Sequence, residues 1–234
     1  MGSFRHGRYL LLFGLLSACS LIDGCTPDPI DRAAFDRLYE TAPPPVEGPL
    51  RVYHLGHSLV GKDMPAMLKQ LAGDDHSFNS QLGWGTNLKE HWEPNLPVNG
   101  FEDSNSHDEY REPHEAMASG DYDVIVFTEA VEIRDAIEYM APADYLRKWS
   151  VSAWAGNPEA RIYFYEVWHE LSDPEGWLER LDRDLSLYWE DEILRRTLAY
   201  DDVTKPIYLI PGGQVMAALV RAVESRGGVG PVTS

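Results

Sequence analysis

The segment RVYHLGHSLV at residues 51–60 places a serine hydroxyl where it could act as a nucleophile. A short apolar strand at residues 52–55 leads into a Gly-x-Ser sequence formed by Gly56 and Ser58, and a predicted helix follows at residues 63–71. Ser58 would therefore lie on a strand-to-helix turn at the carboxyl edge of a sheet, where open α/β folds place their chemistry. The alternative is a serine that merely begins a turn.

The helix that should fix this turn carries clear start and stop signals. Asp63 suits the N-cap, Pro65 fits the first turn and Gly73 fits the C-terminal stop. Apolar residues recur along it at helical spacing, at Met64, Met67, Leu68 and Leu71. This spacing predicts that one face of the helix is buried.

Apolar strand-like segments alternate with amphipathic segments along the rest of the chain. Strands are predicted at residues 77–82, 124–127, 161–167 and 206–210, and helices at residues 143–155, 174–198 and 214–225. The second of these helices would start with Asp173 as its cap and Pro174 as its first residue, and would break near Ser186. The alternation implies a parallel sheet with right-handed crossovers, so we predict an α/β fold with a three-layer α/β/α sandwich.

The stretch from Trp84 to Gly120 interrupts this pattern because it is long, polar and aromatic. Long connections without regular structure are usually functional or mobile in compact domains. We interpret this one as an active-site lid or substrate rim, in which Trp84 and Trp92 could stack on a sugar ring. Packing within the lid is the alternative for both tryptophans.

Two of these segments together resemble a known family. Gly56-His57-Ser58 follows the first predicted strand, and the sequence GWGTN at residues 83–87 follows the second. In these places the two motifs resemble the first two blocks of the SGNH (GDSL-like) hydrolases, a resemblance that covers most of residues 50–213. It implies a flavodoxin-like, mainly parallel five-stranded sheet and a serine hydrolase in which Ser58 attacks an ester carbonyl. The backbone N–H groups of Ser58 and Gly85 would stabilise the oxyanion, with Gly83 as the alternative to Gly85.

Two departures from the family pattern affect the predicted site. The third block normally has an asparagine after the third strand, where this chain has Glu129. A carboxylate donates to an oxyanion only when it is protonated, so Glu129 is predicted to bind substrate, such as a sugar hydroxyl, unless it pairs with Arg134. The Asp-x-x-His block that supplies the family's general base is not found before Ser234. We therefore expect a truncated sequence whose base lies further on, and weak or no activity from the chain as given. His169, after the fourth strand, is predicted to contact substrate, with a loop histidine near the pocket as the alternative.

The N-terminal residues predict export. Residues 1–8 carry two arginines and no acid, Tyr9–Leu16 is apolar but too short to span a membrane, and the sequence LSAC that ends at Cys19 resembles the bacterial lipobox. The resemblance implies that Cys19 is lipidated after cleavage before it; plain secretion is the alternative. We assign residues 1–25 to a signal peptide, 26–49 to a proline-rich linker and 50–234 to the hydrolase domain. The predicted location is the periplasm or cell envelope, with the membrane anchor at Cys19.

Composition limits the partners of the chain. Its formal net charge of −18 would repel phosphate backbones and anionic membrane surfaces, so nucleic acid is excluded and the membrane is reached only through the lipid anchor. No cofactor is predicted, and the spacing of His91, His107 and His114 matches no metal pair. The predicted function is an exported serine ester hydrolase acting on a small-molecule or glycan ester, for which an O-acetyl group on a glycan is one suggestion. The alternative is a non-catalytic ligand- or glycan-binding lipoprotein on the same fold.

Overall fold

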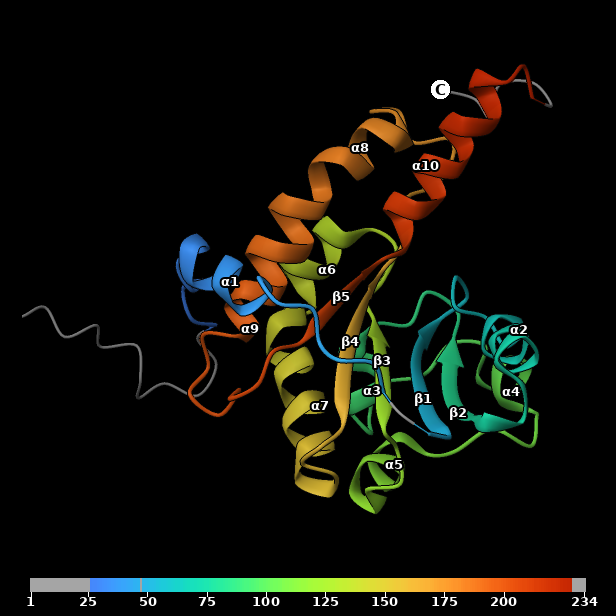
Figure 1. The fold of residues 1–234 in the computed structure, drawn as a ribbon, viewed down its shortest axis with the longest axis vertical. Helices are drawn as coiled ribbons and strands as arrows, with labels where there is room; N and C mark the ends of the chain where they lie inside the picture. The colour runs from blue at the N-terminus through green and yellow to red at the C-terminus, as the bar shows by residue number, and fades with distance from the viewer. Residues whose placement is uncertain (1–25, 47, 229–234) are drawn as a thin grey trace, which may run out of the picture.

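The computed structural model, which describes residues 26–46 and 48–228, is built on one five-stranded parallel sheet (Figure 1). The strands are β1 (Leu50–His57), β2 (His76–Gly83), β3 (Val124–Thr128), β4 (Arg161–Glu166) and β5 (Tyr208–Pro211), in the order β2-β1-β3-β4-β5. All four pairings are parallel. This order is the flavodoxin-like one, and the predicted α/β sandwich is confirmed.

Helices connect the strands, and their bounds follow. They are α1 (Arg32–Leu38), α2 (Asp63–Ala72), the short 3₁₀ turn η2 (Gly73–Asp75), α3 (Leu88–Trp92), α4 (Phe101–Asn105), α5 (Pro113–Ser119), α6 (Ile133–Tyr139), α7 (Pro142–Gly156), α8 (Trp177–Asp184), the π-helix η3 (Leu185–Leu194), α9 (Arg195–Thr197) and α10 (Gly212–Ser225). The stretch from Trp84 to Gly120 is thus not a structureless loop, because α3, α4 and α5 lie within it.

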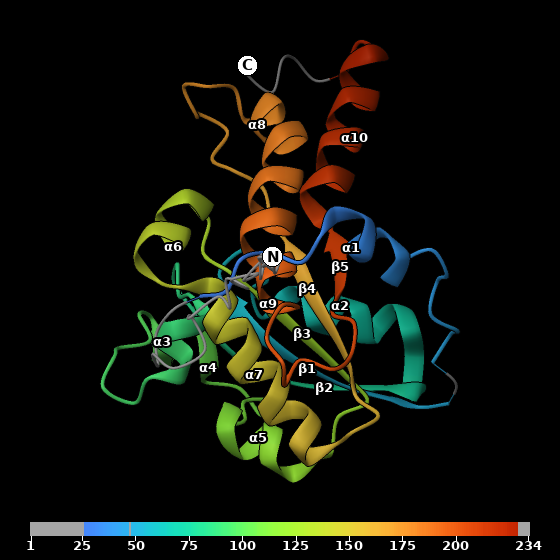
Figure 2. The ribbon, with the colours of Figure 1, turned by 90° about the vertical axis from the view of Figure 1, so that its left-hand side faces the viewer.

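The larger core lies between the sheet and the layer that contains α7 (Figure 2). The predicted apolar face of α7 is confirmed, since Tyr145, Leu146, Trp149 and Ala153 are all buried. Trp149 packs near Phe127 of β3, and Trp189 of η3 packs on Phe164 of β4. These contacts fix the strands from behind and leave their carboxyl ends free to carry the site.

The apolar residues of α2 do not form the buried face that their spacing predicted. The exposed fractions are 60% for Met67, 39% for Leu68 and 85% for Leu71. The N-cap is Lys62 rather than Asp63, while Gly73 ends the helix in the left-handed region as predicted, with φ +80°. Helical spacing identifies a face that can be buried, but the described residues supply no element to cover this one.

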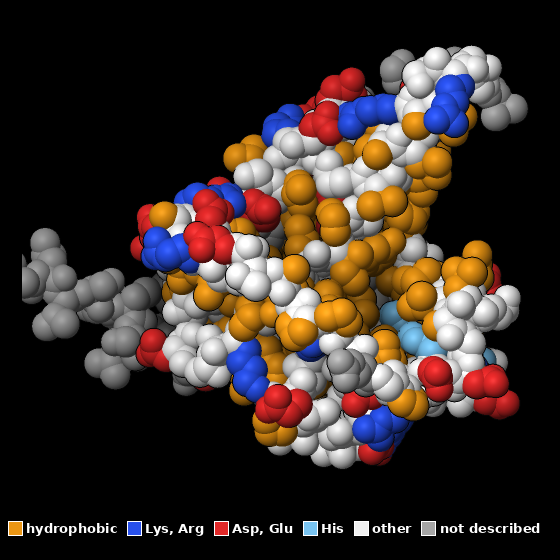
Figure 3. All heavy atoms as spheres, viewed as in Figure 1, with side chains coloured by type: hydrophobic (Ala, Val, Ile, Leu, Met, Phe, Trp, Pro, Cys, Tyr) orange, Lys and Arg blue, Asp and Glu red, His pale blue; other side chains and the backbone are white. Residues whose placement is uncertain are grey.

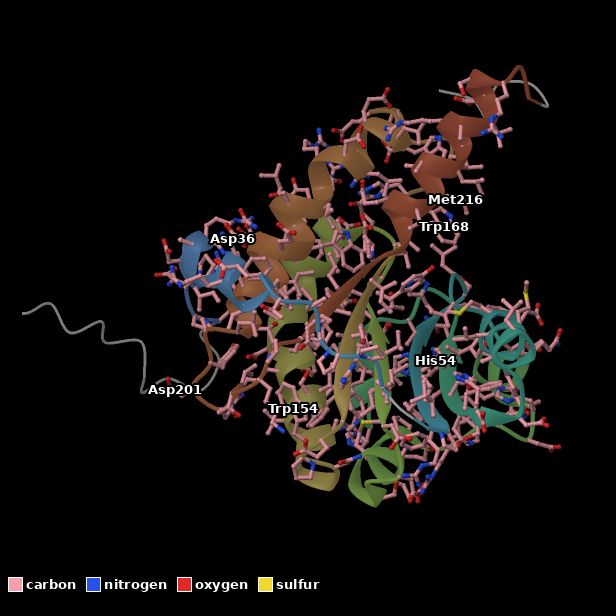
Figure 4. The ribbon with its side chains drawn as sticks, in the orientation of Figure 1. Asp36, His54, Trp154, Trp168, Asp201 and Met216 are labelled. Atoms are coloured by element: carbon pink, nitrogen blue, oxygen red, sulfur yellow. The ribbon has the colours of Figure 1, made fainter. Side chains whose placement is uncertain are left out.

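α10, which follows the carboxyl end of β5, also leaves apolar side chains exposed. It leaves β5 and extends away from the sheet, and it packs on α8 through Ala217, Met216 and Val220. Met216 lies near Trp168 at the base of the helix (Figure 4). Val215, Leu219 and Val223 remain exposed, and hydrophobic side chains run along this side of α10 in Figure 3.

One helix start, one helix break and one segment differ in detail from expectation. α8 begins after Gly176, not at Pro174, and the break predicted near Ser186 is a change from α-helix to π-helix at Leu185. Part of the stretch assigned to the linker packs on the domain. Phe35 of α1 is 6% exposed within the main core, and the Tyr39 hydroxyl donates to the Ile207 carbonyl at 2.7 Å.

Candidate functional site

The strand register brings Ser58 and the GWGTN segment together at the carboxyl edge of the sheet. His57 at the end of β1 pairs with Gly83 at the end of β2, so Ser58 and Trp84 follow on neighbouring strands. Ser58, Trp84 and Gly85 are all exposed. Three of the residues selected from the sequence are therefore exposed and follow the ends of neighbouring strands, while Gly83 at the end of β2 is buried.

The Ser58 turn is fixed by the side chain and backbone of His57. The His57 carbonyl accepts from the amides of Val60 and Gly61 at 2.9 and 3.1 Å, and its Nδ1 accepts from the Leu59 amide at 3.3 Å. Gly56 is needed because a Cβ there would lie 2.5 Å from Thr128 Cγ2 of β3. The Gly-x-Ser sequence thus lets β1 and β3 pack closely while the serine projects from the edge.

Two histidines beneath the turn are structural supports. His57 Nε2 donates to the Glu129 carbonyl at 2.8 Å, and His91 Nε2 donates to the Gly56 carbonyl at 2.9 Å while its Nδ1 accepts from Gln81 at 2.9 Å. Burial lowers the pKa of His57 and lowers that of His91 to about 4. Both rings are therefore neutral near pH 7, with their nitrogens used by these bonds.

The loop after β2 contains Gly85, whose backbone is accessible. Gly85 has φ +59°, which favours glycine, and a Cβ there would meet nothing within 4 Å, so its backbone is open to a ligand. Its N–H has no hydrogen bond to the described part of the chain.

Asn87 and Glu90 form a capping box at the start of α3. The Asn-x-x-Glu spacing is the sequence signal that predicts this cap, and it is absent from the predictions above.

Glu129 occupies the same edge but is completely buried. Its Oε1 accepts from the Ala130 amide at 2.8 Å, and its Oε2 has no hydrogen-bond partner among the described residues. Burial raises its pKa to about 7, against the opposing effect of nearby amides, and Glu90 adds a smaller repulsion. Arg134 does not neutralise it, since Arg134 pairs with Glu132 and Glu175. The Glu129 carboxyl therefore keeps its proton to a higher pH than an exposed carboxyl does.

Thr86 places a second buried side-chain oxygen at this edge, and no pattern in the sequence singles it out. Its Oγ1 lacks a partner within the described residues, and a Cβ at Gly83 would lie 2.1 Å from that oxygen. Gly83 thus serves to make room for the Thr86 side chain.

His169 lies in a different cluster. Only 3% of its surface is exposed, and its Nε2 is 3.3 Å from Asp184 Oδ2 in a buried network centred on Arg180. Burial, followed by the charge of Arg180, lowers the pKa of His169. Strand β3 separates β1 from β4, and neighbouring strands are about 4.8 Å apart, so the ends of β1 and β4 are roughly 10 Å from each other. Neither ring nitrogen of His169 has a hydrogen-bond partner among the described residues, so His169 does not bond to Ser58.

The network around Arg180 holds the far end of the edge together. Arg180 is fully buried and bonds to Glu132 at 2.8 Å, Asp173 at 2.6 Å and Asp184 at 2.9 Å. The hydrogen bonds from Arg180 lower the pKa of Glu132 to about 2. These bonds tie α8 to the loops after β3 and β4.

The described residues bear only in part on the predicted general base and the predicted membrane anchor. No histidine within residues 26–46 and 48–228 bonds to the Ser58 hydroxyl, and that same part of the chain holds no group of three His, Cys, Asp or Glu side chains arranged to bind a metal. None of its helices has the length and apolar character needed to cross a bilayer. The predicted signal peptide and its lipidation residue Cys19 lie outside the described residues.

Comparisons of this chain with family models, with curated proteins and with solved structures gave no match.

Proposed function

We propose that this protein is an exported serine ester hydrolase of the SGNH type, with Ser58 as its nucleophile. The observation that supports the proposal is the register of His57 with Gly83, because an exposed Ser58 and an exposed, left-handed Gly85 follow these paired strand ends. A hydroxyl next to an unengaged backbone N–H is the arrangement that acyl transfer requires.

The chemistry would proceed in two balanced steps. Ser58 Oγ attacks the ester carbonyl carbon, its proton passes to a base, and the tetrahedral oxyanion is stabilised by the Gly85 N–H. The alcohol leaves with a proton as the acyl-serine forms, and water then releases the acid and restores the hydroxyl. Because no described histidine bonds to the Ser58 hydroxyl, another group has to act as the general base.

Trp84 suggests the substrate class. Its side chain is 56% exposed, and a Cβ at Gly100 would lie 2.3 to 2.5 Å from its ring atoms, so one indole face rests on the Gly100 backbone. The Asn105 side chain bonds to both the N–H and the carbonyl of Leu82, which holds α4 and this contact against β2. A fixed aromatic surface beside the nucleophile suits the apolar face of a sugar ring, so we include glycan esters, such as O-acetylated glycans, in the proposal.

A fluorophosphonate ester mimic tests the nucleophile. Wild-type protein should be labelled slowly, and added imidazole should accelerate labelling by acting as an external base. Ser58→Ala should abolish labelling with and without imidazole, whereas Ser77→Ala, which removes an exposed serine at the other end of β2, should leave it unchanged. Equal labelling of Ser58→Ala and wild type would exclude Ser58 as the nucleophile.

The second candidate is a non-catalytic glycan-binding protein on the same fold. It is favoured by the absence of a histidine at Ser58 within the described residues and by a buried carboxyl where the family has a donor amide. An O-acetylated oligosaccharide distinguishes the two. Binding that is lost in Trp84→Ala but kept in Tyr139→Ala, an exposed aromatic on α6, together with no labelling in imidazole, would favour the binder.

A further inference from the structure

A cavity of about 380 Å³ lies away from the Ser58 edge, between α1, η3 and β5. Three aromatic side chains line it: Phe35 from α1, Tyr39 directly after α1, and Tyr208 from β5. Asp36, which Figure 4 labels on α1, and Glu190 of η3 add two carboxylates to the lining. We call this cavity the α1–β5 pocket.

The aromatic rings of the pocket are inclined to one another. Phe35 and Tyr39 have ring centroids 4.9 Å apart at 58°, and Tyr39 and Tyr208 are 6.0 Å apart at 76°. Adjoining walls of this kind present more than one ring face to a group between them. Ring faces carry negative electrostatic potential and therefore attract cations. A neutral apolar group of the same shape does not gain this electrostatic attraction.

The local charge has the matching sign. Three carboxylates, Asp36, Glu190 and Asp191, surround Arg32, and Arg195 also pairs with Asp191, so the cluster keeps one net negative charge. Glu190 Oε2 accepts from Arg32 at 2.7 Å, and its Oε1 has no hydrogen bond to the described residues. The chain itself already places a cation on one of these rings, because the Arg32 guanidinium lies 5.3 Å from the Phe35 centroid.

The walls are held in place by contacts that need no ligand. The Tyr39 hydroxyl donates to the Ile207 carbonyl next to β5, and the Ile30 amide donates to the Arg195 carbonyl at 3.2 Å. Glu190 projects from the ten-residue π-helix, a conformation that is rare and often found at functional sites. A preformed pocket avoids the cost of ordering its walls on binding.

We propose that the α1–β5 pocket binds an organic cation of the alkylammonium class. The cation would lie against the faces of Tyr39 and Tyr208, with the Glu190 carboxylate supplying the opposite charge. This site is independent of Ser58 and of the hydrolase proposal.

Choline and its neutral isostere 3,3-dimethylbutan-1-ol form a matched pair of probes, because they differ chiefly in charge. In an NMR-detected titration of the full chain we expect choline to bind in the millimolar range and the neutral alcohol to bind at least tenfold more weakly. Ser58→Ala should bind choline like wild type. Equal binding of the two probes, or no binding of choline at tens of millimolar, would overturn the proposal.

Variants place the binding in the pocket. Tyr208→Leu should weaken choline binding at least fivefold, because it removes one of the two ring faces that the cation contacts. Tyr139→Leu is the matched control, since this tyrosine is 61% exposed on α6. Weakening by Tyr139→Leu equal to that by Tyr208→Leu would refute the assignment.

Discussion

Replacing Glu129 with glutamine should change how the stability of this protein depends on pH. Burial raises the pKa of the Glu129 carboxyl from 4.5 to about 7, so the folded state holds its proton more tightly than the unfolded state does. For a group of this kind stability is fully present below the unfolded pKa and is lost as pH rises through the folded pKa. A shift of this size corresponds to about 3 kcal/mol of stability lost between pH 4.5 and just above 7.

Glutamine should relieve that cost because it is neutral at every pH. Its amide oxygen can keep the bond from the Ala130 amide, and its NH₂ replaces Oε2, which has no partner among the described residues. We expect Glu129→Gln to gain about 3 kcal/mol over wild type at pH 8 and to differ little near pH 4.5.

The assay must separate Glu129 from the buried histidines, which act in the opposite direction. Burial lowers the pKa of His54 to about 3 and that of His91 to about 4, so their contribution is present above pH 6.5 and is lost as pH falls. Urea unfolding of wild type and variant across pH 5 to 8 removes this background, because both proteins contain the same histidines. Glu40→Gln, at an exposed acid, serves as the control. A variant-minus-wild-type difference that stays constant over this range would refute the reasoning.

Two further predictions concern other parts of the molecule. Arg180→Met should destabilise the protein by about 3 to 5 kcal/mol in chemical denaturation, because it removes a buried guanidinium from Asp184 and leaves that carboxylate with Arg183 alone; a loss below about 1 kcal/mol would contradict the network described. Leu71→Lys should change stability by less than about 0.5 kcal/mol, because the side chain is 85% exposed, and a large loss would mean that this face is covered in solution.

The sheet and its carboxyl edge could be predicted from the sequence because both depend on local signals. The continuous apolar run of β3 indicates a strand buried on both faces, and Gly56 before Ser58 indicates a turn at a strand end. The order of the strands was expected from the family resemblance, and the placement of Trp84 and Gly85 beside Ser58 then follows from parallel register. The strand and the turn can be predicted because each is determined by a few neighbouring residues.

The parts that could not be predicted depend on contacts between distant residues. No pattern around His91 indicates that it would bond to Gly56, which is 35 residues away. His169 and Glu129 follow their strands as surface candidates would, yet both are buried, His169 by the Arg180 network and Glu129 by the turn and α3. Position after a strand predicts the edge on which a side chain lies, but only tertiary packing decides whether it reaches the surface.

The same distinction applies to the apolar helix faces. Met67, Leu68 and Leu71 have the spacing of a core-facing stripe, as do Val215, Leu219 and Val223, and all six remain accessible. Parallel sheets are normally covered on both sides, and here one side carries the large core while the other is covered mainly by α2. A hydrophobic period therefore reports what a helix is able to bury, and the described residues leave these two helices with apolar surface still to be covered. If that surface is satisfied in solution, Leu71→Lys will be costly, and the fold around Ser58 will include more than the elements described.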